Sequence, residues 1–136
     1  MTTQKCVNDI AYQTVGCAIE VHKHMGPGLL ESVHEECLVD ELITVGLFPK
    51  RQIAVPISYK GKELASPLKL DLIINDLVIV EIKSVEVLLP VFTAQLLTYL
   101  KLSGEPKGLL INFNCENITK HLIPLVTDEF AKLPKP

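Results

Sequence analysis

The sequence lacks the features that mark membrane, secreted and strongly basic proteins. It has no run of the roughly 18 apolar residues that span a bilayer, and no apolar segment near its start that resembles a signal peptide. Its four cysteines form no Cys-x-x-Cys pair, and we interpret them as reduced thiols of a cytoplasmic protein. It has no internal repeat and no Lys/Arg block, and its net charge of −3 argues against non-specific binding to nucleic acid.

What is present is the composition of one globular domain. The 136 residues are 48 % hydrophobic and 21 % charged, and a chain of this length can bury a sizeable core. We expect a single domain over residues 1–136, with its core at about 5–125. Residues 126–136, which include two prolines, are expected to form a loose tail.

Positive charge is concentrated in one short region, which contains Lys50, Arg51, Lys60 and Lys62. These cations could form a local basic patch. The alternative is a solvated loop surface, and from the sequence alone we favour that alternative.

Hydrophobic periodicity predicts three helices. Residues 5–24 and 29–45 carry apolar side chains at helical spacing, and the Gly-Pro-Gly sequence at 26–28 separates the two segments. A third helix is predicted over residues 91–102, directly after Pro90.

The remaining chain has strand patterns. Residues 52–64 alternate around a turn at Lys60-Gly61, and residues 68–83 predict a hairpin that completes an antiparallel meander. Strands at 108–113 and 118–125 follow the third helix, and a strand–helix–strand unit implies a parallel pairing. The predicted fold class is therefore α/β, with a mixed central sheet (an antiparallel meander plus a parallel crossover strand) flanked by helices.

Three charged residues occur in the two apolar runs of the hairpin, 70–74 and 77–83: Asp71, Glu81 and Lys83. Burying an unpaired charge costs several kcal/mol or more, so such residues need a reason to be there. Two carboxylates that converge near a lysine can hold a hard divalent cation and stabilise the charge of a phosphoryl-type transition state. The alternative is a structural ion-pair cluster, and the spacing alone does not decide between the two.

The two carboxylates meet in only one hairpin register. Asp71 lies opposite Glu81 if residues 75–77 form a three-residue loop. A two-residue turn would point the carboxylates to opposite faces of the sheet, unless a bulge corrects the register. The metal-site hypothesis therefore predicts a three-residue loop or a bulge.

Four further residues lie on the helices. Glu31 is at the start of the second helix, where an acidic side chain suits the positive end of the helix dipole. His34 lies on the apolar stripe, and we interpret it as a core histidine in preference to a ligand. Gln95 and Tyr99 are four residues apart, so they share one face of the third helix.

Taken together, these motifs resemble the GxxExxY protein family. The residues that carry the resemblance are Gly28-Leu-Leu-Glu31-Ser-Val-His34, Asp71, Glu81-Ile-Lys83, Pro90-Val-Phe-Thr-Ala-Gln95-Leu-Leu-Thr-Tyr99-Leu-Lys-Leu and Gly108-Leu-Leu-Ile-Asn-Phe113. The resemblance extends over about residues 10–125, and the family is placed in the PD-(D/E)xK, or restriction-endonuclease-like, nuclease superfamily. The core of that superfamily is a helix, a three-stranded meander, a crossover helix and a further strand, which matches the order predicted above.

The resemblance implies a set of metal ligands. Asp71 and Glu81 would bind Mg²⁺, with Mn²⁺ as an alternative, together with the backbone carbonyl of Ile82. Glu31 would complete the acidic site directly or through water. Lys83 would orient the attacking hydroxide and stabilise the phosphate.

The third helix would add two more catalytic residues. Gln95 and Tyr99 match a Gln-x-x-x-Tyr signature of the RecB-like branch, where they line the site next to the metal. The chain departs from the family at His34, which replaces a Tyr but can still contact a phosphate, and at Phe92, which replaces a frequent His and removes a polar contact.

The implied function is metal-dependent hydrolysis of phosphodiester bonds in nucleic acid, in DNA more than in RNA. The negative net charge then calls for a narrow basic groove or for a partner that supplies affinity. Two alternatives remain open. One is a non-catalytic binding module that retains the nuclease fold, as a homodimer or with a protein partner. The other is a hydrolase of a small phosphorylated substrate, which a closed pocket would favour.

Overall fold

A five-stranded sheet separates two layers of helices in the computed structural model, which describes all residues from 1 to 136. The first half of the chain forms α1 (Gln4–Met25), α2 (Glu31–Thr44), β1 (Pro49–Val55), β2 (Ser58–Tyr59), β3 (Lys62–Glu63), β4 (Leu68–Ile74) and β5 (Val78–Lys83). The second half forms α3 (Pro90–Ser103), β6 (Lys107–Asn112), the short 3-10 helix η1 (Ile118–Lys120), β7 (Leu122–Val126) and α4 (Asp128–Ala131). None of these helices has the length and apolar character needed to cross a membrane.

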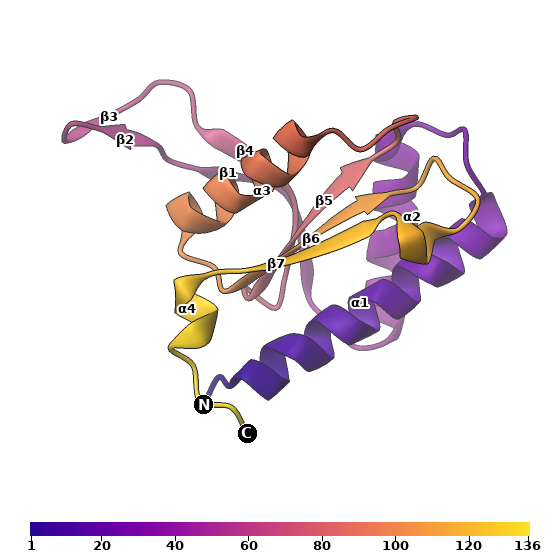
Figure 1. Cartoon of the computed structure of the whole chain (residues 1–136), viewed down its shortest axis with the longest axis horizontal. Coiled ribbons are helices and arrows are strands. Elements are labelled where there is room, and N and C mark those ends of the chain that lie inside the picture. The colour runs from indigo at the N-terminus through magenta and orange to yellow at the C-terminus, as the bar shows by residue number, and fades with distance from the viewer.

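The sheet has the strand order β1-β4-β5-β6-β7, with β1 and β7 at its edges (Figure 1). β4 pairs antiparallel with both β1 and β5. β5 pairs parallel with β6, and α3 is the crossover that connects these two strands. The predicted combination of an antiparallel meander and a parallel crossover strand is therefore confirmed.

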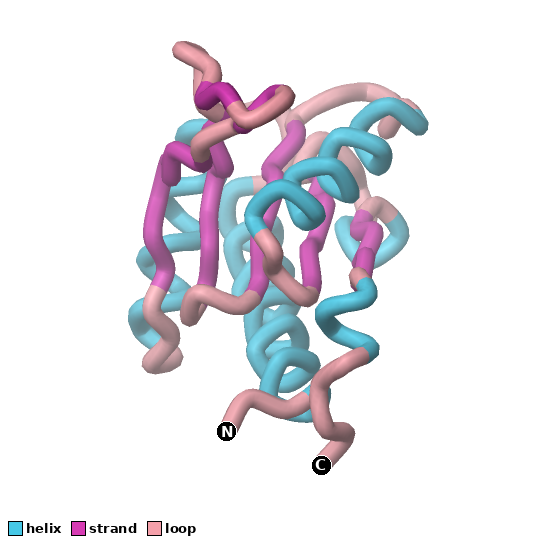
Figure 2. The backbone as a smooth tube through the Cα atoms, turned by 90° about the vertical axis from the view of Figure 1, so that its left-hand side faces the viewer, coloured by secondary structure: helices cyan, strands magenta, loops and turns pink.

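Each face of the sheet carries its own hydrophobic core. The larger core joins α1 and α2 to one face and includes Leu38, Leu72, Val80 and Phe113. The smaller core joins α3 to the opposite face and includes Leu70, Ile79, Leu96, Leu100 and Leu110. Figure 2 shows the strands lying between α3 on one side and α1 and α2 on the other.

The hairpin between β4 and β5 has the register that the metal-site hypothesis requires. Ile74 pairs with Val78, which leaves residues 75–77 as a three-residue loop. Asn75 and Asp76 have φ values of 53° and 54°, a left-handed conformation that Asn and Asp tolerate better than most residues. The Asn75 side chain also accepts a hydrogen bond of 2.8 Å from the Phe48 amide, which anchors the loop. The prediction of a three-residue loop is confirmed.

A second, shorter hairpin projects away from the sheet between β1 and β4 (Figures 1 and 2). We call residues 56–67 the β2–β3 arm. Its turn is the predicted pair Lys60-Gly61, whose φ values of 50° and 79° fit a two-residue type I′ hairpin. The Leu64 amide donates to the Ile57 carbonyl at 2.8 Å and extends the ladder toward the base of the arm.

The end of the chain differs from the loose tail that we expected. The Gln4 and Lys5 amides donate to the carbonyls of Pro134 and Lys135 at 2.7 and 3.3 Å. The first amides of a helix have no partner within the helix, so the tail satisfies two groups that α1 leaves open. Phe130 also packs against the larger core, and the expectation of a loose tail is wrong.

Gly108 of β6 sets how closely α3 approaches the sheet. A Cβ atom at this position would lie 3.0 Å from one Leu96 methyl and 3.1 Å from a Leu100 methyl. Both leucines are fully buried in the smaller core, so they have little room to move.

We expect Gly108→Val to destabilise the fold by about 1–3 kcal/mol, because it forces extra atoms into this packed contact. Urea denaturation measures the change. Gly16→Ala in α1 is the matched control, since nothing lies within 4 Å of a Cβ there. That change should stabilise the helix by about 0.5–1 kcal/mol. Equal effects of the two substitutions would contradict the role assigned to Gly108.

Candidate active site

The acidic pair of the hairpin ends the regular pairing of β4 and β5. The last paired residues are Leu72 and Val80, and Asp71 and Glu81 come next. There the Asp71 amide donates to Glu81 Oε1 at 3.1 Å, and the Ile82 amide donates to Asp71 Oδ2 at 2.8 Å. Each carboxylate thus accepts from the backbone of the facing strand, where a carbonyl would otherwise accept. The sequence brings these two carboxylates together as predicted.

Each carboxylate keeps one oxygen without a protein partner. Asp71 Oδ1 and Glu81 Oε2 accept no hydrogen bond within the chain, and neither is a buried orphan. Oxygen donors of this kind suit Mg²⁺, which binds through one or two carboxylates and keeps several of its waters. The donor set therefore fits a hard divalent cation, and Ile82 offers its carbonyl as a further candidate ligand.

No third acidic side chain joins the pair. The structure contains no group of three or more His, Cys, Asp or Glu side chains able to hold a metal ion. Glu31 is exposed at the first residue of α2 and is not gathered with Asp71 and Glu81. Its contribution through a bridging water stays a prediction.

The environment of Glu81 favours its protonated form. Its side chain is only 8 % exposed, and burial together with the adjacent Asp71 carboxylate raises its pKa to about 8. The hydrogen bond from the Asp71 amide and, less strongly, the charge of Lys83 oppose this rise in pKa. Two carboxylates this close cannot easily be charged at once without a cation. A divalent cation would displace the Glu81 proton and neutralise the pair.

Lys83 lies on the same side of the sheet as α3. Its ammonium group is 4.7 Å from the centroid of the Phe92 ring, a cation–π distance. No ion pair joins it to Asp71 or Glu81. The alternative of a structural ion-pair cluster is therefore not what the structure contains. The face of the Phe92 ring supports the Lys83 ammonium group.

The other predicted residues of α3 extend the site. Burial and the negative charges of Glu81 and Asp71 raise the pKa of the Tyr99 hydroxyl, which stays a hydrogen-bond donor. Gln95 is three residues after Phe92 and four before Tyr99, so it shares their helix face, and it is exposed. The charges of the acidic pair thus act on Tyr99, and Phe92 contacts Lys83, whereas Gln95 shares their helix face without a contact to the pair.

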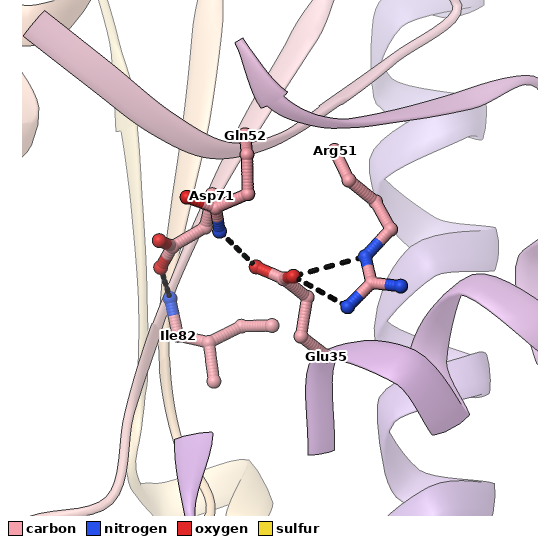
Figure 3. A network of polar contacts seen from close by, with 5 residues as sticks. All are labelled: Glu35, Arg51, Gln52, Asp71 and Ile82. Atoms are coloured by element: carbon pink, nitrogen blue, oxygen red, sulfur yellow. Dashed lines mark hydrogen bonds and ion pairs between the residues drawn. The ribbon is translucent and has the colours of Figure 1, made fainter. Parts of the chain in front are cut away.

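A buried carboxylate that the sequence did not single out binds Gln52, the β1 residue opposite Asp71 (Figure 3). Glu35 of α2 is 5 % exposed and accepts a hydrogen bond of 3.0 Å from Arg51 Nε and one of 2.8 Å from Gln52. Arg51 Nη2 also lies 3.0 Å from Glu35 Oε2 in the same ion pair. Gln52 has a φ of 49°, and its pairing with Asp71 is missing although the register on either side is unchanged. Asp71 is thereby freed from regular pairing with both neighbouring strands.

The segment after Lys83 is held by a polar residue inside the sheet. Asn112 is completely buried, donates to the Val85 carbonyl at 2.9 Å and accepts from the Val85 amide at 3.1 Å. The Ser84 hydroxyl donates to the Leu29 carbonyl at 2.8 Å, which ties the α1–α2 loop to the end of β5. A lone asparagine in an apolar strand was the sequence signal for this role.

His34 is a core residue, as the sequence indicated. It is 0 % exposed, and its ring stacks on Phe113 with centroids 4.5 Å apart. Its Nε2 lies 3.1 Å from the Gly26 carbonyl, and its Nδ1 has no partner. The Nε2 atom therefore carries the proton and holds the α1–α2 loop, and an imidazole buried in this way does not reach a phosphate.

The raised pKa of Glu81 predicts how stability without metal depends on pH. The folded chain holds this proton more tightly than the unfolded chain, whose ordinary value is 4.5. The stabilisation that this proton gives to the folded chain is therefore complete below about pH 4.5. It is lost as the pH rises through about 8. Urea denaturation in EDTA at a series of pH values should show the free energy of unfolding falling across this window.

Two variants separate the groups responsible. Glu81→Gln should remove the upper part of the pH dependence, since the amide cannot titrate. Glu105, whose pKa burial and Asp76 raise to about 7, contributes a slope of the same sign, and Glu105→Gln should remove only that part. An unchanged pH dependence in Glu81→Gln would contradict this account of the acidic pair.

Comparison with known proteins agrees with the geometry. A family model described as the PD-(D/E)XK nuclease superfamily matches residues 8–123, a span that includes Asp71, Glu81, Lys83 and all of α3. No curated protein and no solved structure gives a significant match. The narrower resemblance to the GxxExxY family stays a prediction. The mixed sheet with helices on both faces has the restriction-endonuclease-like arrangement, and the chain belongs to the PD-(D/E)XK nuclease superfamily.

Proposed function

We propose that the chain is a metal-dependent nuclease that hydrolyses phosphodiester bonds of nucleic acid, DNA in preference to RNA. The observation that carries this proposal is the pair of facing carboxylates, each with one oxygen free, next to Lys83. Membership of the nuclease superfamily supports the reaction class, and divalent metals are typical of that superfamily.

The proposed metal ligands are Asp71, Glu81 and the Ile82 carbonyl, with Glu31 contributing through water. Mg²⁺ is the expected cation and Mn²⁺ a substitute. When bound, such a cation lowers the pKa of water and neutralises the charge that develops on the phosphate. The carboxylates reach the required form when Glu81 loses the proton that it holds in the metal-free chain.

The remaining residues bind and orient the phosphodiester. The Lys83 ammonium, supported by the Phe92 ring, would stabilise the negative charge of the phosphate. The Tyr99 hydroxyl, kept protonated next to the carboxylates, would donate a hydrogen bond. The exposed Gln95 amide would contact the substrate beside the metal.

The shape of the molecule favours a polymeric substrate over a small one. A cavity of about 610 Å³ lies between α3 and the β7–α4 segment, on residues such as Leu97, Gly104 and Thr127. Asp71, Glu81 and Lys83 line neither this cavity nor four smaller ones of about 250–470 Å³. An open site can admit a long chain, whereas a small phosphorylated substrate calls for a pocket that encloses it.

The test measures Mn²⁺ binding by calorimetry, and cleavage of labelled DNA and RNA with Mg²⁺. Asp71→Asn and Glu81→Gln should abolish metal binding and reduce cleavage by about 100-fold or more, because the cation supplies several kcal/mol to the transition state. Lys83→Met should reduce cleavage to a similar extent while metal binding persists.

Glu105→Gln is the control, because it also neutralises a partly buried carboxyl with a raised pKa, but at the opposite end of β5 beside Asp76. This variant should cleave like the wild type. Metal binding without cleavage of any nucleic acid would favour a small phosphorylated substrate. A folded protein that binds no metal would favour the non-catalytic module, as a homodimer or with a protein partner.

A further inference from the structure

Charge is distributed very unevenly along this chain. Residues 50–69 contain five of the 13 Lys and Arg residues and only one of the 16 acidic residues. This segment therefore carries a net charge of +4, and the rest of the chain carries −7. The overall charge of −3 conceals a basic segment, and that segment contains the β2–β3 arm.

Two of the five cations already have acidic partners. Lys50 pairs with Asp76 at 2.9 Å, and Arg51 pairs with the buried Glu35 at 3.0 Å. Lys60, Lys62 and Lys69 are exposed and have no carboxylate partner. The uncompensated positive charge thus lies in the arm and at its base.

The arm places an aromatic ring between its two lysines. Tyr59 pairs with Lys62 across the hairpin, so their side chains lie on the same face. The ammonium group of Lys60 is 5.4 Å from the centroid of the Tyr59 ring, and that ring is 61 % exposed. The only acidic residue, Glu63, pairs with Ser58 and points to the opposite face. One face of the arm therefore presents an exposed ring together with two nearby cations.

The arm projects from one end of the sheet, next to the start of β4 (Figure 2). β4 begins at Leu68, at the base of the arm, and Asp71 follows three residues later, about 10 Å along the strand. β5 runs antiparallel to β4, so Lys83 ends at this same end of the sheet. A chain bound along the arm could continue directly to the acidic pair.

We propose that the β2–β3 arm binds an unpaired nucleic-acid strand, with Tyr59 stacked on a base and with Lys60 and Lys62 on the adjacent phosphates. One part of this inference rests on the proposed function, namely that the bound strand continues from the arm toward the acidic pair. The arm supplies the local positive charge that the acidic chain otherwise lacks. It also replaces the solvated loop that we favoured for these lysines from the sequence.

The exposed Tyr59 ring predicts that the arm binds a single strand in preference to a duplex. Every base has a flat face on which tyrosine can stack, but in a duplex these faces are covered by neighbouring bases. Duplex binding would use the lysines and not the ring. An acidic protein surface would also contact the lysines, but its binding would not involve a base stacked on the Tyr59 ring.

The test is fluorescence anisotropy in EDTA with a labelled single-stranded oligonucleotide and its duplex. K60Q/K62Q should weaken single-strand binding at least 10-fold and lower the salt-dependence slope by about 1.4, because each phosphate that a lysine neutralises on a single strand adds about 0.7 to that slope. Tyr59→Ala should weaken it by about 10-fold with an unchanged slope, and should leave duplex binding as it was.

Matched variants remove the same groups elsewhere on the surface. K101Q/K120Q removes two exposed lysines that also lack carboxylate partners, and Tyr12→Ala removes a tyrosine that is 82 % exposed on α1. Both controls should bind like the wild type, and circular dichroism should show all variants folded.

The proposal is overturned if the arm variants lose no more affinity than these controls, if Tyr59→Ala weakens duplex and single strand equally, or if the wild type binds no single strand. Because EDTA removes any metal, this result is independent of catalysis. Normal arm-dependent binding combined with cleavage that is indifferent to Asp71→Asn would refute the proposed function and leave the arm assignment standing.

Discussion

The candidate site depends on a reciprocal exchange between two carboxylates and the backbone of the facing strand. Asp71 and Glu81 each accept an amide hydrogen bond across the β4–β5 hairpin at the point where regular pairing ends. The exchange holds the half-buried Asp71 against the buried Glu81, where charging both groups at once is costly. It also leaves one oxygen of each carboxylate free, so the pair is held rigidly and yet is able to bind a cation.

Several distant parts of the chain keep this exchange in place. Glu35 and Gln52 interrupt the pairing of β1 beside Asp71, and Asn112 holds the segment that leaves Lys83. Gly108 permits the close approach of α3, which brings a tyrosine and a lysine-supporting ring to the acidic pair. The layers of the fold thus converge on one end of the sheet, from which the basic arm also projects.

The sequence predicted the parts of this site that depend on periodicity and loop length. The spacing of Asp71 and Glu81 required a three-residue loop, and the structure has it, because left-handed Asn75 and Asp76 close the hairpin in that register. Long-range polar contacts left no periodic signal. Neither the partnership of Glu35 with Gln52 nor the docking of the tail onto α1 could be read from spacing, because both join segments far apart in the chain.

Anomalous diffraction from crystals soaked in Mn²⁺ would test the central claim most directly, since it locates the cation without relying on a substrate. The account predicts one strong peak bound by Asp71 Oδ1 and Glu81 Oε2, the two oxygens that no backbone amide occupies. That peak should be absent from crystals of Glu81→Gln. A peak bound by other residues would contradict the account. So would the absence of any peak when the carboxylates of Asp71 and Glu81 are ordered and ionised.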